Sequence, residues 1–136
     1  MILTDYNDLI NQAMTARENS YSPYSTFRVG SAVLCKDGRV YLGCNIENAS
    51  YGETVCAERV AIFKAISDGN RDFSAIAIVG GINKITDFAF PCGACRQVLC
   101  EHCAPDLKII LYNGNETKIC TLGELFPHSF GKSDIK

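Results

Sequence analysis

Two cysteine-containing phrases that lie far apart in the chain limit how it can fold. The first is Cys56-Ala57-Glu58, and the second is Pro91-Cys92-Gly93-Ala94-Cys95. Because residues three apart share one face of a helix, Cys92 and Cys95 can both reach a single metal ion. If Cys56 joins them, the fold must bring two distant segments to one place. A helix is expected to begin at the second phrase, since proline is common at helix starts.

Three cysteine ligands would leave the fourth position of a zinc ion open. Such an open site is typical of catalytic zinc, which makes water reactive near neutral pH. Helix starts also favour thiolates, because their free N–H groups and the helix dipole stabilise negative charge. A cysteine two residues before a glutamate, followed later by Pro-Cys-x-x-Cys, resembles a known pattern of catalytic zinc sites. That resemblance implies one Zn²⁺ per chain, bound by Cys56, Cys92 and Cys95. The alternatives are three core cysteines or a redox Cys-x-x-Cys, and Pro91 with the upstream Cys-Ala-Glu phrase argues against both.

A second Cys-x-x-Cys, Cys100-Glu101-His102-Cys103, raises the alternative of a structural zinc site with four cysteines. Only four residues separate Cys95 from Cys100, whereas common zinc modules have roughly 15 to 20 between pairs. On a continuous helix these two residues would be about 7.5 Å apart along the axis. That separation suits one tetrahedral ion poorly, so the three-cysteine site is favoured.

The chain has eight cysteines, so a disulfide framework is a further alternative. Asp37-Gly38 predicts a hairpin with a two-residue turn, which would set Cys35 opposite Val40 and Cys44 opposite Ser31. In that register the two cysteines do not face each other. We therefore expect them, like Cys120, to be small buried hydrophobic residues.

Composition limits the partners and the location of the protein. The formal net charge is −2 and lysines and arginines are not clustered, which argues against binding a phosphate backbone. No apolar run approaches the roughly 20 residues of a membrane helix. Residues 1–5 lack the features of a signal peptide, so the chain is expected to be cytoplasmic with reduced cysteines. A small ligand, rather than nucleic acid or membrane, is the predicted partner.

The hydrophobic pattern predicts alternating helices and strands. With 136 residues, of which 47% are hydrophobic, the chain is expected to form one domain over residues 1–136. Helical spacing and turn residues predict helices over 5–19, 55–67, 92–103 and 122–126. Compact apolar runs predict strands over 27–35, 39–45, 73–79, 107–112 and 116–120. This order predicts an α/β fold with three layers, α/β/α, around a mixed central sheet.

Glu58 and Arg59 are the candidates for chemistry beside the metal. Hydrolysis needs a group that moves protons between water and the leaving group, and a carboxyl next to zinc can do so. The spacing from Cys56 does not by itself aim Glu58 at the metal, and an ordinary helix N-terminal acid is the alternative. Three thiolates leave the zinc site at −1, so a cation should compensate. Arg59 lies three residues after Cys56 and could donate to the sulfurs, with Arg96 as a second candidate; a solvent-exposed arginine is the alternative for each.

Taken together, these phrases resemble those of small zinc-dependent cytidine deaminases of the homotetrameric class. The matching segments run in order along nearly the whole chain: Pro23-Tyr24-Ser25, Phe27-Arg28-Val29-Gly30, Gly43-Cys44-Asn45-Ile46-Glu47-Asn48-Ala49, Cys56-Ala57-Glu58-Arg59, Pro91-Cys92-Gly93-Ala94-Cys95-Arg96-Gln97 and Glu124-Leu125-Phe126-Pro127. The resemblance implies a cytidine deaminase-like fold and hydrolytic deamination of cytidine, and also of 2'-deoxycytidine, to the uracil nucleoside and ammonia. It also implies that Glu58 is the proton shuttle.

The resemblance also implies a set of substrate-binding residues: Phe27, Asn45, Ile46, Glu47, Tyr51, Ala57 and Phe130. Asn45 and Glu47 would hydrogen-bond a sugar hydroxyl, and Phe27 would pack on the pyrimidine. Ala57 would offer its backbone to the base, while Tyr51 and Phe130 would help build a neighbouring subunit's site in a homotetramer. On residue type alone, Asn45 and Glu47 are equally suited to a turn, and Phe27 to a core.

Two alternatives to cytidine deamination remain open at the level of the sequence. One is deamination of another amino-nucleoside, which a direct substrate comparison would distinguish. The other is a non-catalytic structural zinc or redox module, which would bind metal without turnover. Nucleic-acid editing is disfavoured because the chain lacks a basic groove and has cysteine where editing enzymes carry a histidine ligand.

Overall fold

Five strands form a single sheet in the computed structural model, which describes residues 6–135. The strand order is β2-β1-β3-β4-β5. β1 is antiparallel to both β2 and β3, β3 and β4 are parallel, and β4 and β5 are antiparallel. The predicted mixed sheet is therefore confirmed. The strands are β1 (Arg28–Cys35), β2 (Val40–Cys44), β3 (Phe73–Gly81), β4 (Lys108–Tyr112) and β5 (Thr117–Thr121).

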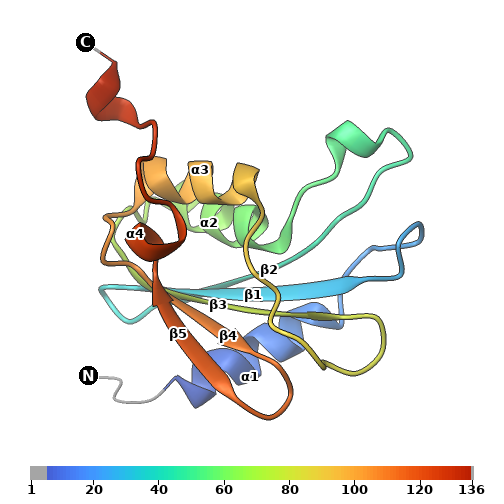
Figure 1. The fold of residues 1–136 in the computed structure, drawn as a ribbon. Coiled ribbons are helices and arrows are strands. Elements are labelled where there is room, and N and C mark those ends of the chain that lie inside the picture. The colour runs from blue at the N-terminus through green and yellow to red at the C-terminus, as the bar shows by residue number, and fades with distance from the viewer. Residues whose placement is uncertain (1–5, 136) are drawn as a thin grey trace.

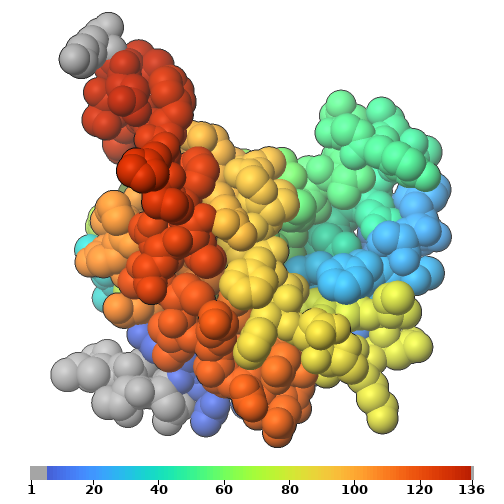
Figure 2. All heavy atoms as spheres, in the orientation of Figure 1, coloured from blue at the N-terminus to red at the C-terminus, as the bar shows by residue number. Residues whose placement is uncertain are grey.

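Helices cover both faces of the sheet, so the three-layer prediction is confirmed (Figure 1). α1 (Asn7–Arg17) lies on one face, whereas α2 (Ala57–Ser67) and α3 (Gly93–His102) lie on the other. The short helix α4 (Leu122–Leu125) follows β5. Two 3₁₀ turns, η1 (Tyr51–Glu53) and η2 (Lys132–Asp134), belong to segments that project on the α2–α3 side. Figure 2 shows the C-terminal segment, in red, standing out from the body of the molecule.

The central strand β3 supplies side chains to both layers of the core. Successive residues of a strand point to opposite faces. Ala75, Ala77 and Val79 pack with α1, whereas Ile76 and Ile78 pack with α2 and α3. The strand is buried on both faces, which explains why its sequence is a continuous apolar run without polar alternation.

The β1–β2 hairpin differs from the prediction by one residue in register. Leu34, not Cys35, lies opposite Val40, and Cys44 lies opposite Gly30. The turn uses three residues because the Cys35 N–H bonds the Arg39 carbonyl at 2.8 Å. Gly38 takes a φ of +93° to close it, a conformation that favours glycine. The cysteines still do not face each other, and all eight are free thiols.

The helices are slightly shorter than predicted. The expected start of the first helix at residue 5, with the amino-terminal residues 1–5, lies outside the described residues, and α1 begins at Asn7. α2 and α3 begin one residue after Cys56 and Cys92, which makes both cysteines N-cap residues. Within residues 6–135, no helix has the length and apolar character needed to span a membrane.

Close packing of α2 on β2 sets the position of the start of α2. A Cβ added at Gly43 would lie 2.4 Å from the Ala57 carbonyl oxygen and 2.5 Å from the Ala61 nitrogen. Both are backbone atoms of α2, so no side chain can turn away to make room. Only glycine lets the helix approach the strand this closely, and the contact fixes the turn that follows Cys56.

We expect Gly43→Ala to lower the free energy of unfolding by about 1–3 kcal/mol or more, because the added methyl forces α2 away from the sheet. Urea unfolding midpoints would measure the loss. Gly52→Ala is the matched control, since a Cβ added there would meet no atom within 4 Å apart from its chain neighbours, and its φ is not in the left-handed region. Equal midpoints for wild type and Gly43→Ala would show that α2 can shift without cost.

Candidate metal centre

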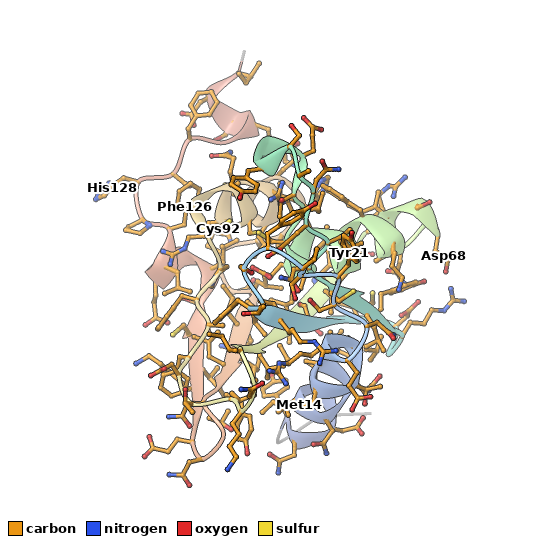
Figure 3. All side chains as sticks on the ribbon, turned by 90° about the vertical axis from the view of Figure 1, so that its right-hand side faces the viewer. Met14, Tyr21, Asp68, Cys92, Phe126 and His128 are labelled. Carbon is orange, nitrogen blue, oxygen red and sulfur yellow. The ribbon has the colours of Figure 1, made fainter. Side chains whose placement is uncertain are left out.

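Three cysteine thiols converge at the starts of α2 and α3. Cys56 is the N-cap residue of α2, and Cys92 is the N-cap residue of α3. Cys95 lies in the first turn of α3, where its backbone N–H donates to the Cys92 sulfur at 3.4 Å. Figure 3 labels Cys92 at this helix start, on the side from which the two projecting segments extend. The structure thus brings together the two phrases that the sequence separates.

The spacing of the sulfurs fits a tetrahedral zinc ion. All three Sγ atoms lie within 4.8 Å of one another, and Cys56 Sγ is 3.7 Å from Cys92 Sγ. Zn–S bonds of about 2.3 Å at tetrahedral angles place two sulfurs about 3.8 Å apart. Cys95 is buried, whereas Cys92 is exposed. The group is therefore accessible from one side, as an open metal position requires.

Hydrogen bonding distributes charge unevenly over the sulfurs. The Cys95 thiol, with Arg59 and Cys92, lowers the pKa of Cys56. The bond to Cys56, together with burial, raises the pKa of Cys95. A site in which one thiolate is already favoured is suited to a cation.

Arg59 is a cation in direct contact with these sulfurs. Its Nη2 donates to Cys56 Sγ at 3.5 Å, and this bond raises the pKa of Arg59. Arg59 Nε is buried and has no hydrogen-bond partner within residues 6–135. Zinc binding would make the sulfur cluster anionic. The Arg59 guanidinium suits such a cluster, because it has a further buried N–H that could donate to a sulfur.

Glu58 is buried beside the candidate zinc ligands Cys56 and Cys95. Its side chain is only 4% exposed, and burial raises the pKa of its carboxyl to about 7. The carboxyl also interacts with its own backbone N–H and with the Cys95 thiol. The spacing from Cys56 could not predict the direction of the Glu58 side chain, because Cys56 lies just before the first residue of the helix. In the structure, the carboxyl lies near the Cys95 thiol.

Asn45 is buried, and its side-chain amide bonds mainly to backbone groups. Its Oδ1 accepts from the Val29 N–H at 2.9 Å and from the Ser20 hydroxyl, and its Nδ2 donates to the Phe27 carbonyl at 2.8 Å. The amide has two N–H groups, of which one is used here. Asn45 therefore fixes the backbone on both sides of Arg28, and within residues 6–135 its second N–H is left for a further acceptor.

Glu47 organises the loop that precedes Phe27. Its Oε1 accepts the N–H groups of Tyr24 and Ser25 at 3.0 and 3.1 Å, and its Oε2 accepts from the Ser25 hydroxyl. These bonds, led by the Ser25 hydroxyl, lower the pKa of the Glu47 carboxyl. The ionised carboxylate thus holds the loop in which Thr26 takes a positive φ of 59°.

Ile46 connects this loop to the first cysteine. Its N–H and carbonyl pair with Val55, at 2.9 and 3.0 Å, and Val55 directly precedes Cys56. Its side chain, 45% exposed, lines an apolar hollow of about 420 Å³ against the outer face of α2. No sulfur of the cluster lines that hollow. Ile46 therefore links the loop to the site through its backbone, while its side chain points to another surface.

The aromatic candidates lie at the surface. Phe27 is 41% exposed and lines a hollow of about 230 Å³ with residues 80–84 and 86–89. Tyr51, in η1, makes an edge contact with Tyr24 at a centroid distance of 6.0 Å.

Phe130 is 60% exposed, but its carbonyl accepts from Gln97 Nε2 at 2.8 Å. Ala57, by contrast, is fully buried at the first turn of α2.

Cys100 and Cys103 do not lie close enough to the other three cysteines to bind the same metal ion. Within residues 6–135, the only group of three or more cysteine, histidine or acidic ligands close enough for one ion is Cys56, Cys92 and Cys95. Cys100 instead contacts the C-terminal segment at Ser129, 3.6 Å from its hydroxyl. Burial raises the pKa of Cys103 to about 12, as expected for a thiol packed against the core. The four-cysteine alternative therefore has no support.

Sequence reasoning missed Ser20 and Ser25, whose hydroxyls orient Asn45 and Glu47. Ser25 stands inside the matched phrase Pro23-Tyr24-Ser25, so a signal for it was present in the sequence. Ser20 had none, because its partner is distant in the chain and the pairing depends on the fold.

Comparisons with known proteins agree with this site. The family described as "Cytidine and deoxycytidylate deaminase zinc-binding region" matches residues 3–111. A cytidine deaminase of Halalkalibacterium halodurans is 50% identical over 132 residues, covering 96% of this chain and 98% of the relative.

Solved structures give the same result. The cytidine deaminase of Burkholderia pseudomallei has a TM-score of 0.86 and 45% identity, covering 93% of this chain and 100% of the other. That of Mycobacterium tuberculosis has a TM-score of 0.81 and 42% identity, covering 95% and 99%. The fold, the sulfur cluster and the matched region lead to one conclusion. The chain belongs to the cytidine and deoxycytidylate deaminase zinc-binding family.

Proposed function

We propose that this protein hydrolyses cytidine to uridine and ammonia and also accepts 2'-deoxycytidine. The observation that carries the proposal is the buried Glu58 carboxyl beside three converging thiols. The similarity to cytidine deaminases over nearly the whole chain supports the choice of substrate. No feature of the site favours another amino-nucleoside, which stays an outcome of the substrate comparison.

Cys56, Cys92 and Cys95 would hold the zinc ion, which would supply a water molecule activated for attack near neutral pH. Glu58 would take a proton from the attacking water and deliver it to the ring nitrogen. The same carboxyl would then take the second proton of that water from the new hydroxyl on C4 and give it to the departing amine. The C4–N bond breaks as the C4 carbonyl forms, so that water and cytidine become uridine and ammonia. A carboxyl with a pKa of about 7 can both accept and donate a proton at neutral pH.

Arg59 would balance the charge of the sulfurs. Three thiolates around Zn²⁺ carry a net charge of −1, which weakens the pull of the metal on water. The Arg59 guanidinium already donates to Cys56 and has a second buried N–H without a partner in the described part of the chain. Donation to the thiolates would remove electron density from the sulfurs and restore the activation of water.

Substrate would be held by the loop that Asn45 and Glu47 organise. The Asn45 N–H that has no partner among the described residues and the ionised carboxylate of Glu47 can each bond a sugar hydroxyl while keeping their backbone contacts. Phe27 would then pack on the pyrimidine, and the backbone of Ala57 would meet the base. Ile46 would contribute by holding this loop to Val55.

Tyr51 and Phe130 would complete the site of a neighbouring subunit in a homotetramer. Both rings are mostly exposed, on segments that project beyond α2 and α3. The bond from Gln97 to the Phe130 carbonyl holds the backbone of the tail while leaving the ring free. An exposed aromatic ring can contact another chain, and the hydrogen-bonded backbone keeps that ring in position.

The remaining parts of the proposal concern organisation and location. Residues 1–136 would form one catalytic domain that acts in the cytoplasm on a free nucleoside. The net charge of −2 and the lack of a cationic cluster support a small-molecule substrate over nucleic acid or a membrane surface.

We expect zinc-loaded wild-type protein to convert cytidine to uridine, and Glu58→Gln to lose at least about 100-fold in turnover while keeping one zinc per chain. The amide keeps the shape of the side chain but cannot shuttle the proton. Loss of ultraviolet absorbance by cytidine would measure turnover, and elemental analysis would measure zinc.

A panel of cytidine, 2'-deoxycytidine and other amino-nucleosides would accompany this assay. Turnover of a different amino-nucleoside alone would replace the proposed substrate. Zinc-loaded protein that turns over no nucleoside would favour the structural-module alternative. Equal turnover by wild type and Glu58→Gln would remove the carboxyl from the mechanism.

Arg59→Gln is expected to lower kcat by about 10- to 100-fold in the zinc-loaded protein, because the thiolate charge is no longer offset. Arg59→Lys keeps the charge and should lose less. Steady-state kinetics normalised to zinc content would test both. Unchanged kcat in a zinc-replete Arg59→Gln protein would exclude the charge-balancing role.

Subunit complementation would test Phe130. We expect Phe130→Ala to have low activity alone, because its neighbours' sites lack the ring. Mixed tetramers of Phe130→Ala and Glu58→Gln subunits should recover part of the activity, since some sites then combine an intact Glu58 with a partner's phenylalanine. Activity that stays at the level of the separate variants would place Phe130 outside the shared site.

A further inference from the structure

Arg96 bridges two backbone segments beside the metal candidates. Its Nε donates to the Pro91 carbonyl at 2.7 Å, and its Nη1 donates to the carbonyl of Leu125. Its backbone N–H also donates to the Cys92 carbonyl at 2.9 Å. The side chain is half-buried, and both of these side-chain bonds go to carbonyl oxygens rather than to a sulfur. Arg96 is therefore neither the second charge partner of the thiols nor the solvent-exposed arginine that the sequence suggested.

The bond to Pro91 acts on the peptide unit that carries Cys92. A carbonyl fixed in direction fixes the plane of its peptide, and that plane includes the backbone N and Cα of the following residue, Cys92. Cys92 has φ of −68° and ψ of 170°, and it is the N-cap of α3. Its own side chain is exposed, so packing alone holds the thiol weakly. Within residues 6–135, Arg96 makes the only side-chain hydrogen bond to the Pro91 carbonyl.

The bond to Leu125 anchors the other end of the guanidinium. Leu125 ends α4, where the last carbonyls have no partner inside the helix. α4 follows directly from β5 and is fixed by a capping box between Thr121 and Glu124. Because one rigid fork bonds both carbonyls, the segment before α3 is tied to the end of α4, which directly follows the strand β5.

We propose that Arg96 is the positioning residue for Cys92, holding its sulfur at the distance from Cys56 that zinc requires. The inference rests on the proposed function only in taking Cys92 as a zinc ligand. Arg59 acts on sulfur charge, whereas Arg96 acts on sulfur position. The direct effect of losing Arg96 is therefore weaker zinc binding, and not a change in a step of the reaction.

Zinc affinity of the full-length protein, measured by competition with a fluorescent chelator, tests this role without any nucleoside. Arg96→Met keeps the aliphatic stem but has no donors, and it should bind zinc about 10- to 100-fold more weakly. Arg96→Lys can reach one carbonyl but not both, so its loss should be smaller. In the cobalt-substituted protein, the thiolate-to-metal absorption should weaken in Arg96→Met, because the third sulfur is less often bound.

Arg71→Met is the matched control. Arg71 also donates to a helix-end carbonyl, that of Ile66 at 2.9 Å, but at the far end of α2 from Cys56. It should leave zinc affinity and the cobalt spectrum unchanged, even if it lowers the melting temperature.

Wild-type zinc affinity and cobalt spectrum in a folded Arg96→Met protein would overturn the positioning role, whatever its melting temperature. If Arg96→Met fails to fold, an unchanged zinc affinity in Arg96→Lys would overturn it equally. Cys92→Ser serves as the reference. Wild-type zinc affinity in that variant would remove Cys92 from the ligand set, and the inference about Arg96 would fall with it. A lack of cytidine turnover alone would leave all these affinities unaffected and would count only against the proposed reaction.

Discussion

Three sulfur atoms within 4.8 Å of one another are the constraint that the rest of this structure satisfies. Unbound, such a group is unfavourable once its thiols ionise, because like charges gather at one point. Two helix starts reduce that cost, since Cys56 and Cys92 are both N-cap residues at the positive end of a helix dipole, and the Cys92 sulfur accepts the Cys95 N–H. The central sheet then serves as the frame that sets the two helices at the right separation. Gly43 supplies a close contact of that frame, by letting the first turn of α2 rest on β2.

The first candidate zinc ligand, Cys56, and the proposed substrate loop are parts of one hydrogen-bonded unit. Ile46 pairs with Val55 and, on its other side, lies against Tyr21. Cys56 follows this small bridge along the chain, and Asn45 and Glu47 flank it. A shift in the loop would therefore be transmitted to the first cysteine through the backbone. The arrangement explains how a loop with little regular structure can keep a fixed position relative to a metal.

The layers, the strands and the metal candidates could be predicted because each depends on local pattern. Apolar runs such as that of β3 and the cysteine spacing in α3 are properties of short segments. The hairpin register could not be predicted, because Asp37-Gly38 suits both a two-residue turn and the three-residue turn that forms. The direction of Glu58 also required the fold, since it depends on how α2 and α3 meet. Long-range side-chain bonds to the backbone, such as those of Asn45 and Arg96, have no pattern in the sequence at all.

Arg59 and Arg96 show how one residue type can serve a site in two physically separate ways. Each lies in the first half of its helix, Arg59 three residues after Cys56 and Arg96 four residues after Cys92. Their acceptors separate them: a sulfur for Arg59, two carbonyls for Arg96. A bond to sulfur changes the electron density that reaches the metal, whereas bonds to carbonyls change where a sulfur stands. Since an open zinc site depends on both the charge and the position of its ligands, neither arginine can replace the other. The acceptor that a side chain reaches, rather than its charge, therefore determines its role here.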